Sequence, residues 1–352
     1  MTDAFTASPA AAAEARASAG RLTTRLAWTA LVANTVVVLQ GAVVRLTGSG
    51  AGCGSHWPLC NGTVVPLDPT LETLIEFSHR LLSGGVLLIG AWLLVRALRV
   101  RRDKPGLAAF ATASAALLVV EALIGAATVL LGLTGDNTSV ARGYWVAGHL
   151  VNSLLLIGAL ACTVAFARDD APAYPLRLSR QVPLAAVLLT GVVGALLLSF
   201  TGGIAAMGNT IFPPESLAEG LRADFDPASH PLIRLRILHP LIAVAVGTYL
   251  FVGLGLAWWL KPVPAARGVA RTLLGVYLAQ LAVGTFNLAL LGPFVLQLLH
   301  LFLAVAAFAL LWRWAAEPRP PVSSVPVEDA PPVARRGSRR QFVIAAGGLV
   351  AA

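Results

Sequence analysis

Four histidines lie within long apolar stretches of the sequence: His79, His149, His239 and His300. Each is roughly five to seven residues, or about 8–11 Å of helix, from the same end of its stretch. An ionisable side chain inside a membrane span is costly and marks a functional site by default. Neutral imidazole is the commonest metal ligand, and paired histidines are axial ligands of haem iron. A histidine that is only hydrogen-bonded within a helix bundle is the alternative, but four at matched depth favour two ligand pairs.

Six arginines lie apart from the other basic residues, and five of them are at or near the same ends of the apolar stretches. Haem carries two propionate groups, which suit bidentate recognition by guanidinium. Arginines that reach for the membrane surface are the alternative. Arg80 directly follows His79 and so points to a different helical face, which weakens its case. The candidates for propionate contacts are Arg45, Arg80, Arg142, Arg234 and Arg236, and Arg222 is the sixth.

A carboxylate accompanies only one histidine at the spacing of a helical turn. Glu76 precedes His79 by three residues, so both side chains share a face. A carboxyl group in apolar surroundings gains proton affinity, which suits proton transfer near a substrate. Arg236 takes the place equivalent to Glu76 before His239. We therefore expect two chemically different sites, with an interfacial carboxylate beside Arg80 as the alternative for Glu76.

Two cysteines lie seven residues apart in a glycine-rich polar segment, which reads Thr47-Gly-Ser-Gly-Ala-Gly-Cys53-Gly-Ser-His-Trp-Pro-Leu-Cys60. Dense glycine predicts a tightly folded loop. Cys53 and Cys60 can close a structural disulfide or act as a reversible thiol pair. Cys162, inside an apolar stretch, is expected to be a small core residue.

The composition requires a membrane around these residues. Of 352 residues, 57% are hydrophobic and 12% are charged, whereas soluble domains have about 25% charged residues. The net charge of +9 comes from basic residues that gather between apolar stretches. That distribution records membrane orientation and predicts no nucleic-acid partner.

Eight stretches are long enough to span a membrane, which takes about 20 apolar residues. They cover residues 26–46, 73–95, 107–131, 142–167, 182–203, 235–260, 270–291 and 294–315. Gly292 and Pro293 separate the last two, which predicts a tight helical hairpin.

The basic residues set the orientation of these spans. Of the 26 lysines and arginines, 20 fall on one side of the predicted membrane, which the positive-inside rule makes cytoplasmic. Both termini are then cytoplasmic, and the loops at 47–72 and 204–233 face outward, where disulfides persist. The expected location is the cell membrane.

The chain reads as two copies of one four-span unit. His79 and His239 are 160 residues apart, and His149 and His300 are 151 apart. The motif Glu121-Ala-Leu-Ile-Gly125 corresponds to Gln280-Leu-Ala-Val-Gly284, and the end of the first span at Arg45–Gly48 to Ser199–Gly202. An even number of spans per copy makes this a parallel repeat.

The expected fold is therefore an all-α polytopic membrane protein with two pseudo-symmetric four-helix bundles. The expected parts are a loose cytoplasmic arm at 1–25, bundles at 26–167 and 182–315, a linker at 168–181 and a disordered tail at 316–352. Residues 338–352 have a twin-arginine-like pattern at the wrong end for an export signal and too few apolar residues for a span.

Together these residues resemble the haem A synthase family over roughly residues 25–315. The resemblance lies in the stretch from Arg45 to Cys60, Glu76-Phe-Ser-His79-Arg80, His149, Leu238-His239-Pro240 and Leu299-His300. It implies oxidation of the methyl group of haem O to the formyl group of haem A for haem–copper oxidases. It also implies a haem b bound by His239 and His300, and the substrate haem bound by His79 and His149.

The same resemblance assigns further roles. The catalytic glutamate of the family matches Glu76, and its outer-loop disulfide matches Cys53 and Cys60. Membrane lipid, haem O synthase and assembly factors of haem–copper oxidases are the implied partners, and a thiol-disulfide oxidoreductase and a homo-oligomer stay open. Some bacterial members carry a second cysteine pair after the fifth span, and residues 204–233 contain none.

Two other functions are consistent with parts of the pattern. A di-haem b-type cytochrome that exchanges electrons with quinol would also need four histidines, but haems that carry electrons across the bilayer lie at different depths. A transporter would fit the internal repeat but not the matched histidines or the unbroken spans.

Overall fold

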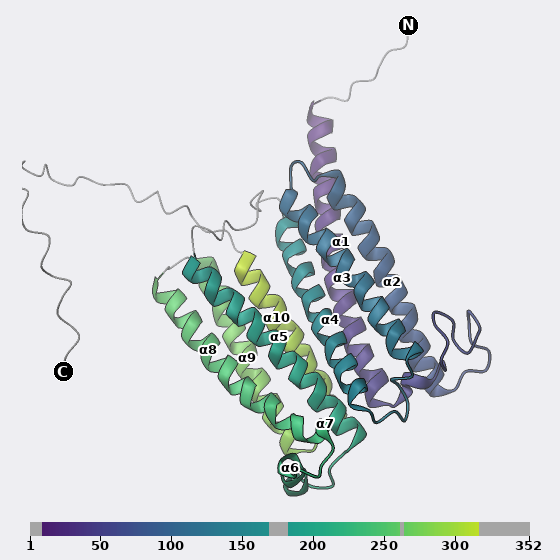
Figure 1. Ribbon diagram of the computed structural model, residues 1–352. Coiled ribbons are helices and arrows are strands. Elements are labelled where there is room, and N and C mark those ends of the chain that lie inside the picture. The colour runs from purple at the N-terminus through teal and green to yellow at the C-terminus, as the bar shows by residue number, and fades with distance from the viewer. Residues whose placement is uncertain (1–8, 169–181, 261–263, 317–352) are drawn as a thin grey trace, which may run out of the picture. The chain divides into compact units, whose positions relative to one another are not determined.

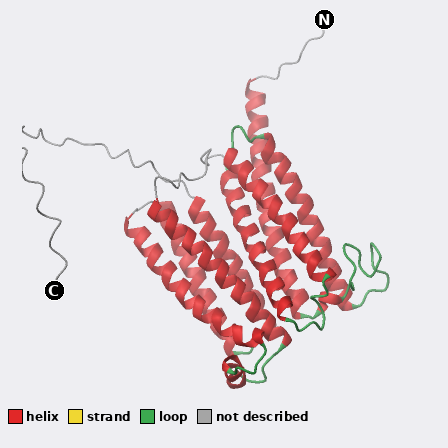
Figure 2. Ribbon diagram, in the orientation of Figure 1, coloured by secondary structure: helices red, strands yellow, loops and turns green. Residues whose placement is uncertain are grey.

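The computed structural model describes residues 9–168, 182–260 and 264–316, and within these ranges the chain is helical with no named strand (Figures 1 and 2). Eight helices are long and apolar enough to cross a membrane, as the sequence predicted. They are α1 (Pro9–Leu46), α2 (Leu71–Arg99), α3 (Pro105–Leu130), α4 (Val140–Ala167), α5 (Val182–Ile211), α8 (Leu238–Leu260), α9 (Pro264–Ala289) and α10 (Phe294–Ala316).

Helix α1 begins earlier than expected. The segment 1–25 was expected to be a loose arm, but the helix starts at Pro9 and runs without a break into the first span. The reason is the alanine-rich sequence after Pro9, because alanine has the highest helix propensity and proline is favoured at a first helical position.

In the described part of the chain, four short helical segments lie between the spans, and two of them correct the prediction of a long outer loop at 204–233. Helix α5 continues to Ile211, α6 covers Leu217–Phe225, and α7 (Pro231–Arg234) and η3 (Leu235–Ile237) lead into α8. Ser216 is the N-cap of α6, and its hydroxyl accepts the N–H of Glu219 at 3.2 Å. This Ser-x-x-Glu pattern is the start of a capping box and was visible in the sequence. The remaining short segment is η1 (Ser49–Ala51) in the cysteine loop.

The hairpin between α9 and α10 is as tight as predicted. Leu291 and Gly292 adopt positive φ angles of 60° and 74°, and the N–H of Gly292 donates to the carbonyl of Asn287 at 2.7 Å. Glycine adopts this left-handed conformation at no steric cost.

Helix α4 is the central helix of the arrangement. It contacts α1 and α3 on one side and α5 and α10 on the other. Its most apolar stretch is 78% buried, against 11–28% in the other spans. One apolar cluster joins Leu154 and Ile157 of α4 to Val305 and Phe308 of α10. The two halves of the sequence therefore pack against each other through α4 rather than through lipid.

Several expectations lie outside the described residues. These are residues 1–8 of the arm, the linker at 169–181, and the tail at 317–352 with its twin-arginine-like segment.

Candidate functional site

Each intramembrane histidine lies against a glycine of the preceding spanning helix. A Cβ atom placed on any of these glycines would be only 2.8–3.8 Å from the facing imidazole ring. Glycine thus lets each ring approach a helix backbone closely. The pairs are Gly41 with His79, Gly125 with His149, Gly202 with His239, and Gly284 with His300.

This pattern corrects one detail of the expected repeat. The sequence comparison matched Gly48 to Gly202, but a Cβ atom on Gly48 would meet nothing within 4 Å. Gly41 is the glycine of α1 that faces a histidine as Gly202 does. The separation of these two glycines is 161 residues, close to the 160 residues between His79 and His239.

His239 and His300 form the second pair. Their ring centroids are 6.1 Å apart and the rings are nearly perpendicular, at 83°. The Nδ1 atom of His239 is 3.1 Å from the carbonyl oxygen of Leu198, which it can reach as a donor. The Nε2 atom of His300 lies 3.2 Å from the side-chain nitrogen of Gln280, and its buried Nδ1 has no hydrogen-bond partner.

His79 of α2 and His149 of α4 form the first pair. The buried Nδ1 atom of His79 has no hydrogen-bond partner. The Nδ1 atom of His149 is 3.3 Å from a carboxylate oxygen of Glu121 on α3. Glu121 was noticed in the sequence only as part of a repeat, although its position inside a span was itself the signal of a functional residue.

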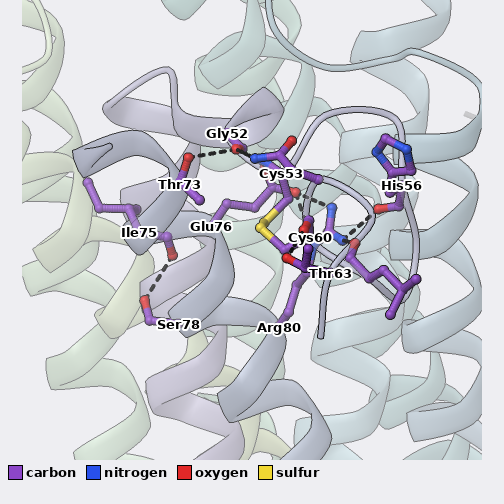
Figure 3. The surroundings of a disulfide bond; sticks show 12 residues. Gly52, Cys53, His56, Cys60, Thr63, Thr73, Ile75, Glu76, Ser78 and Arg80 are labelled. Atoms are coloured by element: carbon purple, nitrogen blue, oxygen red, sulfur yellow. Dashed lines mark hydrogen bonds and ion pairs between the residues drawn. A yellow bond between two sulfur atoms is a disulfide. The ribbon is translucent and has the colours of Figure 1, made fainter. Parts of the chain in front are cut away.

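Glu76 faces the cysteine loop (Figure 3). Its side chain accepts the backbone N–H of Cys53 at 2.8 Å and pairs with Arg80 at 2.5 Å, and only 4% of the residue is exposed. The surroundings of this carboxylate are therefore polar, not apolar as expected from the sequence. Arg80 also donates to the carbonyls of His56 and Leu59, at 2.7 and 2.6 Å.

Cys53 and Cys60 form a disulfide, and both are buried. The carbonyl of Gly52 accepts the hydroxyl of Thr73 on α2 at 2.8 Å, and a Cβ atom on Gly52 would clash with the backbone of Glu72. The loop is thus fastened to the helix that carries His79. Cys162 is buried in the core, as expected.

The other arginines contact protein groups. Arg45 donates to Thr210 of α5 at 2.5 Å and to Gln297 of α10 at 2.9 Å, and so joins the two halves. Arg142 donates to the carbonyls of Gly135 and Asn137.

Arg236, at the place equivalent to Glu76, is buried and pairs with Asp224 at 2.7 Å. Arg222 and Arg234 are exposed.

A groove of about 240 Å³ is lined by Ile124 of α3 and by Tyr144, Trp145 and Gly148 of α4, and its surface is mostly apolar. Gly148 directly precedes His149 in the chain. Such a lining suits an apolar chain.

Fold and site together define a polytopic membrane protein with two intramembrane histidine pairs and a disulfide loop fastened beside one of them. Residues 24–312 match the cytochrome oxidase assembly protein family, COX15-CtaA. The chain belongs to this family.

Individual relatives carry two different names. The chain is 43% identical over 290 residues to a protoheme IX farnesyltransferase of Thermus thermophilus, a match that covers 81% of this chain and 46% of that protein. It is 42% identical over 104 residues to a heme A synthase of Alkalihalophilus pseudofirmus, and 43% identical over 97 residues to one of Shouchella clausii. Those two matches cover 28% of this chain and 33% and 32% of the relatives. The chain thus spans less than half the length of each of these relatives.

Proposed function

We propose that this chain is a membrane oxidoreductase that converts the methyl group of haem O to the formyl group of haem A. Membership of the family and the heme A synthase relatives support the activity. The single observation that carries the proposal is that the two histidine pairs have different surroundings. Among the described residues, the first pair has carboxylates on the spanning helices α2 and α3, Glu76 and Glu121, and has the disulfide loop beside it, whereas the spanning helices around the second pair carry no carboxylate.

The spacing of the second pair fits a haem iron bound by both imidazoles. Metal–imidazole bonds are about 2 Å long, so two imidazoles on opposite sides of one metal ion have centroids roughly 6 Å apart. The rings of His239 and His300 are separated by 6.1 Å. The buried Nδ1 atom of His79 has no hydrogen-bond partner among the described residues, and because buried polar groups are rarely unpartnered, this favours a ligand-binding role for the ring.

The two pairs take different roles in the proposal. His239 and His300 hold a resident haem b, which supplies electron transfer when bound. His79 and His149 hold the substrate haem and fix its position in the first half. The apolar groove lined by residues of α3 and α4 suits the isoprenoid tail of haem O. Replacing a methyl by a formyl group, with one oxygen gained from water, releases four protons and four electrons. The reaction therefore needs both a proton acceptor and an electron path.

Glu76 is the proposed proton acceptor. It lies one turn from His79 on α2, and the Cys53 N–H and Arg80 hold its carboxylate in place. The same contacts connect it to the disulfide, so a redox change of Cys53 and Cys60 would alter the groups around the carboxylate. Both a structural and a redox-active disulfide agree with this geometry.

The proposal includes the membrane arrangement. Both termini lie in the cytoplasm, the cysteine loop and α6 lie outside, and the halves are related by a parallel repeat in the cell membrane. The charge distribution supports the orientation. The four glycine–histidine pairs support the repeat.

Haem extraction with mass analysis tests the activity. Membranes that contain haem O are expected to accumulate haem A when this chain is expressed, and the Glu76→Ala variant is expected to accumulate none. Purified protein that contains two haems b but never haem O or haem A would instead indicate an electron-transferring cytochrome.

Farnesyl transfer to haem is the second candidate, because the Thermus relatives carry that name. The match leaves more than half of those relatives uncovered. Membranes that contain this chain are supplied with haem b and farnesyl diphosphate. Formation of haem O would indicate a farnesyltransferase, and its absence would exclude that function. On the leading proposal such an enzyme is instead the partner that supplies the substrate, and assembly factors of haem–copper oxidases receive the product.

A further inference from the structure

The surroundings of the two histidine pairs differ in one more way, inside the membrane. Glu121 of α3 places a carboxylate 3.3 Å from Nδ1 of His149. The corresponding residue of α9 in the sequence repeat is Gln280, whose carboxamide nitrogen lies 3.2 Å from Nε2 of His300. A carboxylate thus faces Nδ1 of a histidine of the first pair, whereas a carboxamide faces the other ring nitrogen, Nε2, of a histidine of the second.

The carboxylate of Glu121 is held by two further side chains of α4. Asn152 donates to Oε2 at 2.5 Å and to the carbonyl of Leu117 at 3.0 Å, and Ser153 donates to Oε1. Asn152 and Ser153 follow His149 by three and four residues, so all three lie on one helical face. The corresponding positions after His300 are the apolar Leu303 and Ala304.

The Glu121 carboxylate also acts on the imidazole of His149, besides joining α3 to α4. The Nδ1 atom of His149 is buried, and the polar group that it faces among the described residues is the carboxylate of Glu121, at 3.3 Å. The Nε2 atom is on the opposite side of the ring. A carboxylate at the outer nitrogen of a ligating imidazole fixes the ring and increases electron donation by the inner nitrogen. Such partners are one means by which a protein sets the reduction potential of haem iron.

We infer that Glu121 is the positioning residue of His149, and that its carboxylate lowers the reduction potential of the haem in the first half relative to that of the haem in the second. This inference rests on the proposed ligand roles of the histidines. A low potential at the first site and a higher one at the second suit a substrate haem that loses electrons to a resident haem.

Spectroelectrochemical titration of the purified protein loaded with haem b tests the inference. Glu121→Gln copies the carboxamide of the second half and is expected to raise the reduction potential of the first haem while that of the second stays unchanged. Gln280→Glu is the control, because its carboxylate would face Nε2 of His300 in the other half, and it is expected to leave the potential of the first haem unchanged. An unchanged potential of the first haem in Glu121→Gln would overturn the inference.

Two additional variants test the inference in case Glu121→Gln does not bind haem at the first site. Ser153→Ala removes one hydrogen bond to the carboxylate and is expected to raise the first potential by less than Glu121→Gln does. Glu121→Ala removes the partner of the histidine and is expected to weaken haem b binding at the first site by about 10–100-fold. Because the probe is haem b, these readouts need no haem A formation. A wild-type protein that binds two haems but forms no haem A refutes the proposed function and leaves this inference standing.

Discussion

The glycines that face the four histidines allow a graded test of the proposed haem sites. A Cβ atom on Gly202 would lie 2.8 Å from Cε1 and 3.1 Å from Nδ1 of His239. Carbon atoms in contact are normally about 3.5–4.0 Å apart, so the ring must move by roughly 0.7 Å or more. That movement disturbs the contact between Nδ1 and the carbonyl of Leu198.

The size of the expected loss of haem affinity follows from the free-energy cost of overpacking. Forcing an extra methyl group into a packed interior costs about 1–3 kcal/mol, which corresponds to a loss of haem affinity of about 5- to 150-fold. The helix itself gains, because alanine is about 1 kcal/mol more favourable than glycine in a helix interior. We therefore expect Gly202→Ala to insert and fold normally and to bind the haem of the second pair about 5- to 150-fold more weakly.

Alanine substitutions at the other three glycines that face histidines are expected to weaken haem binding in the order of their Cβ–ring distances. Gly284→Ala, also at 2.8 Å, should resemble Gly202→Ala, and Gly41→Ala at 3.2 Å should have a smaller effect on the first site. Gly125→Ala at 3.8 Å, an ordinary contact, should retain wild-type affinity. Haem b titration of the purified variants, followed by absorbance, measures each site. The reasoning is refuted if Gly125→Ala loses as much haem as Gly202→Ala, or if all four variants bind like the wild type.

Three further predictions concern other contacts. Glu76→Ala should abolish haem A formation and keep the haem of the second pair, as haem extraction and difference spectra will show; normal haem A formation would exclude the proposed proton transfer. Arg80→Gln leaves the buried carboxylate of Glu76 without its charge partner, so it should lower the free energy of unfolding by about 3 kcal/mol in thermal unfolding measurements. Glu72→Gln is the control, because Glu72 is exposed and its substitution should change the free energy of unfolding little. Gly158→Ala places a Cβ atom 2.4 Å from the indole nitrogen of Trp312 and should destabilise the contact between the halves by about 1–3 kcal/mol, and an unchanged melting temperature would contradict this.

The spans, the histidines and the cysteine pair could be predicted because each depends on local sequence. Span length and hydropathy fix a transmembrane helix without reference to its neighbours. Cys53 and Cys60 are close enough in sequence for a disulfide in almost any compact loop. The alanine-rich start of α1 and the Ser216 cap of α6 are also local signals, but both are weaker than the apolar pattern of the spans.

The partners of the charged side chains could not be predicted, because they come from distant parts of the chain. The spacing of Glu76 and His79 correctly placed them one turn apart, but the carboxylate faces a loop residue 23 positions away. Arg45 finds its partners on two helices of the other half. Glu121 could have been singled out as an intramembrane carboxylate, yet its neighbours Asn152 and Ser153 become relevant only once α3 and α4 are packed.

The burial of α4 has a consequence for how the protein is made. A chain is synthesised from its N-terminus, so α4 enters the bilayer before α5 and α10 exist. Until those helices arrive, the surface of α4 that they cover faces lipid, with Gly158 open where Trp312 will lie. Helices that insert individually associate afterwards by close packing around small residues. The first half therefore reaches its final packing only when the last span has been inserted.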